Sequence, residues 1–248
     1  DTKRSESTTL FRVIFEDDHL VVLDKPAGLL VLPDRYDPAL ANLYDLLKTK
    51  YGQIYVVHRI DKGTSGLILF AKTETAHASL NRQFEERATE KEYVAICVGE
   101  SSKESGKIDL PLSESPGKRF RMRVDRDKGK ESVTNYKVLE QFREYTFLAA
   151  KPETGRTHQI RVHLSAINLP ILGDAVYGGG DCFLLSRVKP GYRVKGEEKP
   201  LLDRTALHAS RIIFEHPGTQ EKVTLEAELP KDMKIVLNYL RKFRAHSQ

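Results

Sequence analysis

The chain has 248 residues, of which 40% are hydrophobic and 30% are charged, and its formal net charge is +5. This length provides one large domain or two small ones with a substantial core, and the composition excludes disordered and fibrous proteins. The two cysteines are too few for a disulfide scaffold or a zinc site, and the apolar runs are far shorter than a membrane span. Because no apolar leader is present at the start, the sequence predicts a soluble, intracellular globular protein, with the cytoplasm as its default location.

Secondary structure is predicted from the spacing of apolar residues and from capping and turn residues. After a flexible lead-in at 1–9, we expect a hairpin of strands 13–15 and 20–23, a helix within 40–51, strands 54–57 and 67–70, and a helix at 73–89. Strands at 93–98, 132–139 and 145–150 and a helix at 157–167 are expected next. A long loop opened by the glycines 178–180 then precedes strands 211–214 and 223–225 and a helix at 231–243. Thr73 and Thr157 are the expected N-caps of the second and third helices.

Strands dominate this order, and the helices interrupt them irregularly. The order therefore predicts a mixed α+β fold with a mainly antiparallel sheet rather than a regular βαβ array. No internal repeat is present, and no linker divides the chain. Residues 10–248 are accordingly expected to form a single domain.

Positive charge is concentrated in two stretches. The first, 118–130, contains Lys118, Arg119, Arg121, Arg123, Arg126, Lys128 and Lys130, with Phe120 and Met122 between them. The second, 187–199, contains Arg187, Lys189, Arg193, Lys195 and Lys199. Taken alone, this composition favours two solvated surface loops. The alternative is a pair of mobile basic arms that bind phosphates.

The segment 58–66, with the sequence HRIDKGTSG, is the most unusual in the chain. It places an acid, Asp61, among basic or titratable groups and two glycines, between two predicted strands. A loop held by flanking strands is a good platform for reactive groups. The alternative is a salt-bridged, glycine-rich turn, which composition alone favours.

A second polar segment, 154–163, precedes and enters the third predicted helix. Arg161 lies at the edge of the apolar face formed by Ile160 and Leu164, where a buried cation needs a carboxylate partner. His158 and His163 are five residues apart, which misses the spacing of a zinc helix, so we interpret both as packing or RNA-proximal side chains. No nucleotide-binding loop or serine nucleophile motif is present, and neither a cofactor nor a metal is expected.

Several motifs together resemble the RluA family of pseudouridine synthases. Residues 58–66 are similar to that family's HRLDxxTSG signature, with Ile60 in place of leucine, and 91–93 resemble its K-x-Y motif. Further similar segments are 24–28 (with Asp24 for asparagine), 155–164, 170–174 and 207–209. The resemblance extends from about residue 11 to at least residue 228.

The resemblance implies isomerisation of uridine in rRNA or tRNA to pseudouridine, without metal or cofactor. Asp61 corresponds to the catalytic aspartate, which acts at C1′, C2′ or C6 of the nucleotide. Arg161 corresponds to the arginine that pairs with this aspartate and keeps it ionised. Tyr93 offers a ring that stacks on the uracil and a phenol for proton handling at C5.

A buried aspartate cannot reach a stacked nucleotide, so the resemblance also implies that the uridine flips out of the RNA. The basic stretches then become walls of an RNA cleft. The residues expected to contact the substrate are His58, Arg59, Lys91, Arg119, Arg121, Arg123 and Leu207.

Many members of this family carry an N-terminal S4 domain, for which residues 1–9 leave no room. We therefore expect either a compact form without that domain or an upstream domain outside this sequence, and a monomer in either case. One alternative is an inactive relative that binds RNA as an assembly factor, but Asp61, Tyr93 and Arg161 together favour the enzyme. A glycoside hydrolase ranks last, because no second acid lies in a comparable motif.

Overall fold

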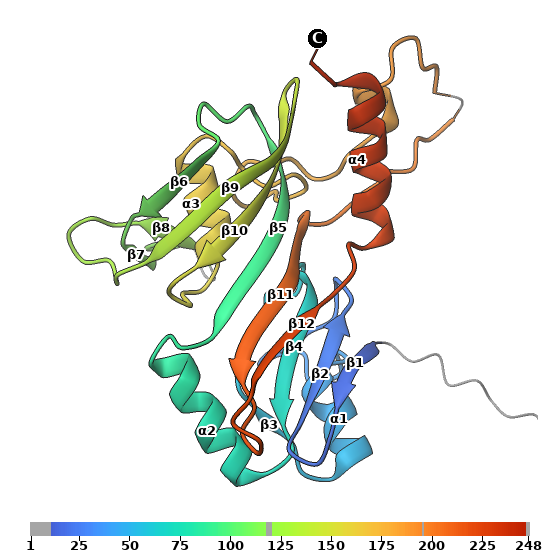
Figure 1. Cartoon of the computed structure of the whole chain (residues 1–248). Helices are drawn as coiled ribbons and strands as arrows, with labels where there is room; N and C mark the ends of the chain where they lie inside the picture. The colour runs from blue at the N-terminus through green and yellow to red at the C-terminus, as the bar shows by residue number, and fades with distance from the viewer. Residues whose placement is uncertain (1–10, 118–120, 195, 247–248) are drawn as a thin grey trace, which may run out of the picture.

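The computed structural model describes residues 11–117, 121–194 and 196–246 (Figure 1). The predicted lead-in at 1–9 lies outside these residues, as do Lys118, Arg119, Phe120 and Lys195 of the basic stretches. The described helices are α1 (Leu43–Tyr51), α2 (Glu74–Glu85), α3 (Gln159–Ala166), α4 (Lys231–Phe243) and a 3-10 turn at Leu185–Arg187.

The strands alternate irregularly with these helices along the chain. They are β1 (Arg12–Glu16), β2 (Leu20–Lys25), β3 (Tyr55–Val56), β4 (Ser65–Ala71), β5 (Glu90–Val98), β6 (Ser105–Asp109), β7 (Leu112–Glu114), β8 (Met122–Val124), β9 (Val133–Phe142), β10 (Tyr145–Pro152), β11 (Leu207–Glu215) and β12 (Lys222–Glu226).

Ten of the described strands form one sheet, whose main path has the order β1-β2-β4-β11-β5-β10-β9-β6. β3 pairs with β4, β12 pairs with β11, and β7 and β8 form a separate hairpin. Among the pairs between the strands of the described chain, β4 with β11 is parallel and the others are antiparallel. The predicted α+β fold with a mainly antiparallel sheet is confirmed.

Helices cover both faces of β2 and β4, so their segments 20–23 and 67–71 are continuously apolar instead of alternating. One set of alternate side chains packs with α2 and consists of Leu20, Val22, Leu67, Leu69 and Ala71. The other set packs with α1 and consists of Val21, Leu23, Ile68 and Phe70. Figure 1 shows α1 and α2 at this end of the sheet. We call it the first half, which comprises β1, β2, β4 and β11.

The second half of the sheet comprises β5, β10, β9 and β6, and it packs against α3 and α4. Leu164 of α3 and Leu237 of α4 belong to the same buried cluster as Ile96 of β5 and Leu148 of β10. α4 presents apolar side chains three and four residues apart to this cluster, namely Met233, Val236, Leu237 and Leu240. This periodicity explains why its predicted bounds, 231–243, are confirmed.

Of the two predicted N-caps, one is confirmed and one is wrong. Thr73 caps α2, because its Oγ1 accepts a hydrogen bond from the Ala76 N–H at 3.1 Å. Thr157 was wrong as the cap of α3, which begins at Gln159 with His158 in the N-cap position. His158 has a φ of 53° and makes no side-chain capping bond. Gln159 Oε1 instead accepts the N–H of Arg156, a residue that precedes the helix, at 3.0 Å.

Several strands were missed where sheet pairing overrides a weak local pattern. β6, β7 and β8 were not predicted, and Met122–Val124 of β8 lies within a stretch interpreted as a basic loop. β11 begins at Leu207 rather than Arg211, because the small and polar residues at its start are buried between β4 and β5.

The parallel contact between β4 and β11 depends on Gly66. Gly66 faces Ala209 across this pair and has a φ of +108°. A Cβ at this position would lie 2.3 Å from the Ala209 carbonyl oxygen. Glycine therefore allows the two strands to approach directly after the loop that contains Asp61.

Gly66→Ala is expected to lower the free energy of unfolding by about 3–5 kcal/mol, because the methyl group meets the Ala209 backbone in a strained conformation. Urea unfolding followed by circular dichroism measures this loss. Gly191→Ala is the matched control: its φ is +67°, but its Cβ would have no neighbour within 4 Å. The control should lose only the strain of about 1–2 kcal/mol. Equal losses in the two variants would contradict the steric argument.

Candidate active site

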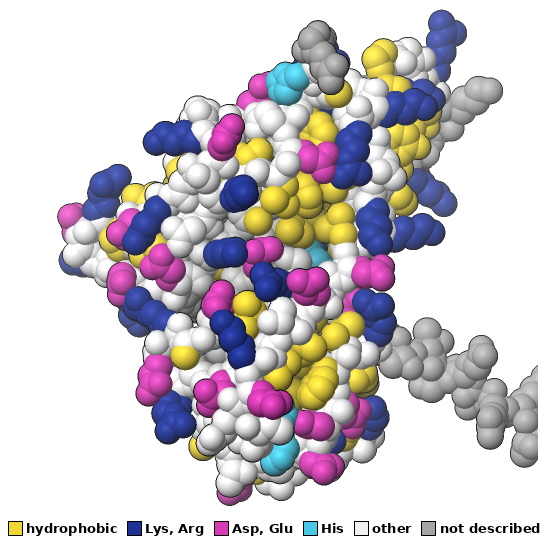
Figure 2. Space-filling model, viewed as in Figure 1, with side chains coloured by type: hydrophobic (Ala, Val, Ile, Leu, Met, Phe, Trp, Pro, Cys, Tyr) yellow, Lys and Arg dark blue, Asp and Glu magenta, His cyan; other side chains and the backbone are white. Residues whose placement is uncertain are grey.

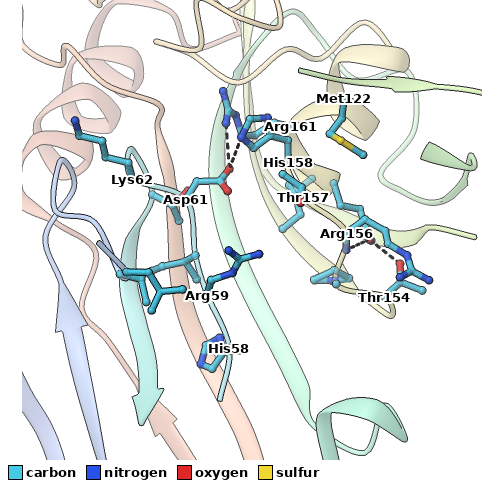
Figure 3. Close-up of a pocket in the computed structure, with 18 of the residues that line it drawn as sticks. His58, Arg59, Asp61, Lys62, Met122, Thr154, Arg156, Thr157, His158 and Arg161 are labelled. Atoms are coloured by element: carbon cyan, nitrogen blue, oxygen red, sulfur yellow. Dashed lines mark hydrogen bonds and ion pairs between the residues drawn. The ribbon is translucent and has the colours of Figure 1, made fainter. Parts of the chain in front are cut away.

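A cleft of about 1690 Å³ lies where the two halves of the sheet meet, and both halves contribute to its lining (Figure 3). The loop before β4 supplies one wall, and the segment that leads into α3 supplies the opposite wall. Seven predicted site residues line this cleft: His58, Arg59, Asp61, Lys91, Tyr93, Arg161 and Leu207.

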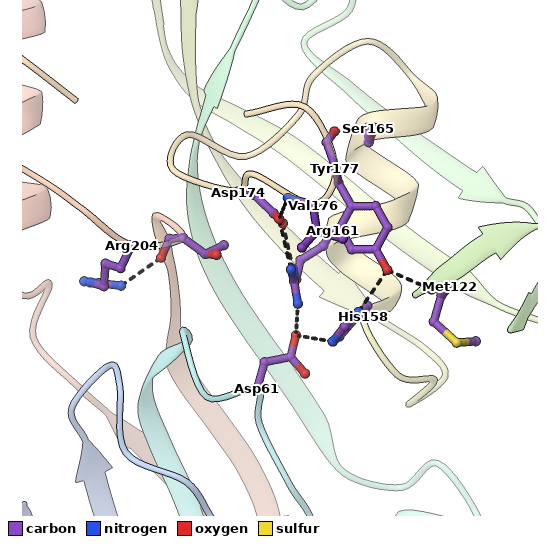
Figure 4. Close-up of polar contacts among 10 residues, drawn as sticks. Asp61, Met122, His158, Arg161, Ser165, Asp174, Val176, Tyr177 and Arg204 are labelled. Carbon is purple, nitrogen blue, oxygen red and sulfur yellow. Dashed lines mark hydrogen bonds and ion pairs between the residues drawn. The ribbon is translucent and has the colours of Figure 1, made fainter. Parts of the chain in front are cut away.

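Arg161 lies between two carboxylates at this cleft. Its Nη1 donates to Asp61 Oδ2 at 3.1 Å, while its Nε and Nη2 donate to the two oxygens of Asp174 at 2.6 and 2.9 Å (Figure 4). The side chain of Arg161 is 11% exposed, that of Asp174 1% and that of Asp61 28%. Burial lowers the pKa of Arg161, but the two carboxylates outweigh burial and raise its pKa overall. The guanidinium is thus a permanent cation, and Asp61 is the carboxylate with access to the cleft.

Asp174 was missed as a site residue by the sequence analysis, although it ends the quoted segment 170–174. Its two oxygens take the fork of Arg161 and leave Nη1 for Asp61. A bidentate pair fixes the plane of a guanidinium as well as its position. Asp174 therefore aims Arg161 at Asp61.

His158 and Tyr177 extend this group of polar contacts (Figure 4). His158 Nε2 lies 3.8 Å from Asp61 Oδ2, and His158 Nδ1 lies 2.9 Å from the Tyr177 hydroxyl. The same hydroxyl accepts the Met122 N–H at 2.9 Å, and the Tyr177 ring lies 5.0 Å from the Arg161 guanidinium. Tyr177 carried no signal in the sequence, because it lies between the predicted helix at 157–167 and the predicted loop opened at 178, outside any predicted element.

Tyr93 and Leu207 are brought together by the pairing of β5 with β11. In this register Tyr93 faces Ala209, and Ala95 faces Leu207. Side chains two residues apart on a strand share a face, so Tyr93 and Leu207 are diagonal neighbours on one face of the sheet. Burial, and secondarily the charge of Asp61, raises the pKa of Tyr93, so its phenol stays neutral.

Lys25 forms hydrogen bonds that hold the loop carrying Asp61. Its side chain is fully buried, and its Nζ donates to the carbonyls of Pro26, Leu29 and Lys62 at 2.9, 2.8 and 3.2 Å. Burial lowers the pKa of Lys25 to about 7, whereas the charge of Asp61 acts in the opposite direction. The tether to Lys62 restrains the backbone directly after Asp61.

His58 lines the cleft and also contacts Leu69 and Phe84. Its Nε2 accepts the Leu69 N–H at 3.1 Å, and its ring stacks on Phe84 with centroids 4.8 Å apart. Burial, assisted by the charge of Lys91, lowers the pKa of His58 to about 3. The ring is therefore a neutral acceptor that orients the start of the loop.

The predicted basic contacts divide between two places. Arg59 is exposed in the cleft, and Lys91 lies there with its Nζ 5.3 Å from the Phe84 ring. Arg121 and Arg123 instead line a smaller hollow of about 420 Å³ beside β8, where Arg123 pairs with Asp125 at 3.0 Å. On the face seen in Figure 2, basic and acidic side chains are interspersed.

Residues 11–117, 121–194 and 196–246 contain no group of three or more His, Cys, Asp and Glu side chains placed to hold a metal ion. No helix among these residues has the length and hydropathy to cross a membrane.

Comparisons with known proteins identify the family. Residues 19–166, more than half of the chain, match the family described as RNA pseudouridylate synthase. The chain is 38% identical over 240 residues to ribosomal large subunit pseudouridine synthase D of Xanthomonas campestris, covering 95% of this chain and 71% of that relative. It is 40% identical over 237 residues to the enzyme of the same name from Pseudomonas aeruginosa, covering 94% and 72% respectively.

Two solved human structures share the fold. Human RNA pseudouridylate synthase domain containing 4 superimposes with a TM-score of 0.70 and 27% identity over 93% of each chain. Human RNA pseudouridylate synthase domain containing 1 does so with a TM-score of 0.67 and 23% identity over 96% of this chain and 97% of that chain. The fold and the family are thus those of an RNA-modifying isomerase. The chain belongs to the RNA pseudouridylate synthase family, as its motifs predicted.

Arg161→Ala is expected to lower the free energy of unfolding by about 3–5 kcal/mol, because it leaves Asp174 buried without its cation. Thermal and urea unfolding measure the effect. Arg241→Ala is the matched control, since Arg241 makes an equally bidentate pair with Glu140 at an exposed site. The control should lose at most about 1 kcal/mol. A loss of at most about 1 kcal/mol in Arg161→Ala would show that Asp61 and Asp174 do not need the Arg161 cation for the stability of the fold.

Proposed function

We propose that this chain isomerises uridine in ribosomal RNA to pseudouridine, with Asp61 as the catalytic carboxylate. The observation that carries the proposal is the Asp61–Arg161–Asp174 group, which presents one carboxyl group to a cleft flanked by Tyr93 and Leu207. The ribosomal substrate is inferred from relatives that are 38% and 40% identical and named for the large ribosomal subunit.

In the proposed reaction the bond between uracil N1 and C1′ breaks, the base turns, and C5 bonds to C1′. The proton at C5 is lost, N1 gains a proton, and the overall reaction is an isomerisation. Asp61 acts at the sugar or the base as nucleophile or general base. Arg161 aims the carboxylate through its hydrogen bond, and Asp174 holds the guanidinium in place.

The reacting uridine must leave its stack to reach Asp61, which lies within the cleft. Tyr93 and Leu207 provide a flat ring and an apolar side chain on adjacent strands, which suits the two faces or the edge of a flipped uracil. Lys25 and His58 hold the loop, so Asp61 keeps its position when the base enters.

RNA binding is assigned to cations at the cleft and beside β8. Arg59 and Lys91 project into the cleft, while Arg121 and Arg123 lie at the neighbouring hollow. Phosphate contacts of this kind supply most of the affinity, and base contacts in the cleft select the uridine. The role of Arg119, the monomeric state and the cytoplasmic location stay predictions.

Asp61→Asn is expected to abolish turnover, with at least about a 1000-fold loss, because the amide cannot act as nucleophile or base. Tritium release from ribosomal RNA fragments and tRNAs transcribed with 5-tritiated uridine measures the reaction directly, since C5 loses its hydrogen. Asp18→Asn, at an exposed turn, is the matched control and should keep full activity. Release by Asp61→Asn at the wild-type rate would refute the assignment of Asp61. No release by the wild type from any RNA would refute the proposed reaction.

Lys91→Met is expected to weaken RNA binding and to reduce the dependence of log Kd on log salt by about 0.7–0.9, the value of one phosphate contact. Methionine keeps the apolar stem that packs near Phe84, so the loss reports the charge. Binding titrations at several salt concentrations measure this slope. Lys234→Met on α4, outside the cleft, should leave the slope unchanged. An unchanged slope for Lys91→Met would remove Lys91 from the phosphate contacts.

A further inference from the structure

A series of polar contacts connects the backbone of β8 to Asp61. Met122 N–H donates to the Tyr177 hydroxyl at 2.9 Å, and that hydroxyl lies 2.9 Å from His158 Nδ1. On the far side of the same ring, His158 Nε2 lies 3.8 Å from Asp61 Oδ2 (Figure 4). Each contact joins segments that are distant in sequence.

One of these hydrogen bonds has a fixed direction: a backbone N–H can only donate, so the Tyr177 oxygen accepts from Met122. The hydrogen of the Tyr177 hydroxyl can then be donated to His158 Nδ1, and a neutral imidazole in that arrangement carries its proton on Nε2. Burial lowers the pKa of His158, although the charge of Asp61 opposes it, which favours this neutral form.

The backbone of His158 is itself unusual. Its φ of 53° places a non-glycine residue in the left-handed region, at the start of a helix that has no side-chain cap. Such strained positions persist where the surrounding structure holds them, and they cluster at functional sites. Here the conformation accompanies a ring that lies between Tyr177 and Asp61.

We propose that His158 and Tyr177 are positioning residues for Asp61, with the Nε2–H of His158 directed at Oδ2 and Tyr177 holding the ring in that tautomer. This inference rests on the proposed role of Asp61. The 3.8 Å separation exceeds a hydrogen bond, and such contacts tighten when substrate binds. Arg161 approaches the same oxygen at 3.1 Å, so the two donors together set the rotation of the carboxylate.

A neutral donor suits this position because Asp61 already has a cation at Arg161. A second positive charge would lower the basicity and nucleophilicity of the carboxylate, whereas an uncharged N–H orients it at less cost to its reactivity.

The same series of contacts connects Asp61 to β8. Arg121 and Arg123 flank Met122, whose N–H is the first donor in the series.

Tyr177→Phe tests the proposal by removing one hydroxyl. We expect a 10- to 100-fold lower kcat for tritium release with little change in KM, because Asp61 loses orientation while the RNA contacts remain. Tyr145→Phe is the matched control, since Tyr145 is about as buried as Tyr177 but lines neither the cleft nor the hollow beside β8, and it should keep wild-type kcat.

Nitrogen-15 NMR of the histidine rings gives a readout that does not depend on turnover. Wild type should show His158 protonated at Nε2, and Tyr177→Phe should show a mixture of tautomers. Comparison with His158→Gln identifies the signal among the eight histidines. Observation of the Nδ1–H tautomer in wild type would overturn the proposal whatever the activity.

A pair of substitutions at His158 separates positioning from packing. Glutamine reaches the place of Nε2 with an N–H, whereas leucine has a similar size and no donor. We expect His158→Gln to keep at least tenfold more kcat than His158→Leu at similar melting temperatures. Equal activity of the two variants, or wild-type kcat in Tyr177→Phe, would overturn the inference while leaving the proposed reaction intact. An inactive wild type would instead count against the proposed reaction itself.

Discussion

Arg161 joins two carboxylates that come from distant parts of the chain, and the cleft is organised around this contact. Asp61 lies in the loop before β4, Asp174 follows α3, and Arg161 belongs to α3 itself. A cation that is 11% exposed is tolerated only with such partners, since an unpaired charge there would be strongly destabilising. The guanidinium therefore serves stability and chemistry together. Its Nε and Nη2 are occupied by the more buried carboxylate, which leaves Nη1 for the carboxylate that faces the cleft.

Strand pairing in the sheet places Leu207 and Tyr93 beside Asp61. The parallel contact of β4 with β11 puts the loop of Asp61 beside Leu207, and the antiparallel contact of β11 with β5 adds Tyr93. Lys25 and His58 then restrain the loop from two sides, through the Lys62 carbonyl and the Leu69 N–H. Rigid strands and a tethered loop are a sound basis for a reaction in which a flipped base must meet a fixed carboxylate.

Elements with a strong local signal were predicted well, and elements that depend on pairing were not. The helix at 231–243 and the cap at Thr73 follow from periodicity and from one short-range hydrogen bond. The strands β6, β7 and β8 are short and partly polar, and they exist because β9 or each other supplies their hydrogen bonds. The cap at Thr157 failed for a related reason. Gln159 satisfies the Arg156 N–H, held in turn by Val133 and Thr134 of β9, a contact that no local pattern reveals.

The sequence by itself determined the fold class, the family and the identity of Asp61, Tyr93 and Arg161 as candidates, because these follow from hydrophobic periodicity and from short ordered motifs. Only the tertiary structure decided which side chains meet them. Asp174, Tyr177 and Lys25 act through contacts that span 13, 19 and 37 residues along the chain, and the pair of Arg161 with Asp61 spans 100. Contacts of this kind arise when buried charges and polar groups must find partners inside a packed fold, and sequence spacing carries no record of that requirement.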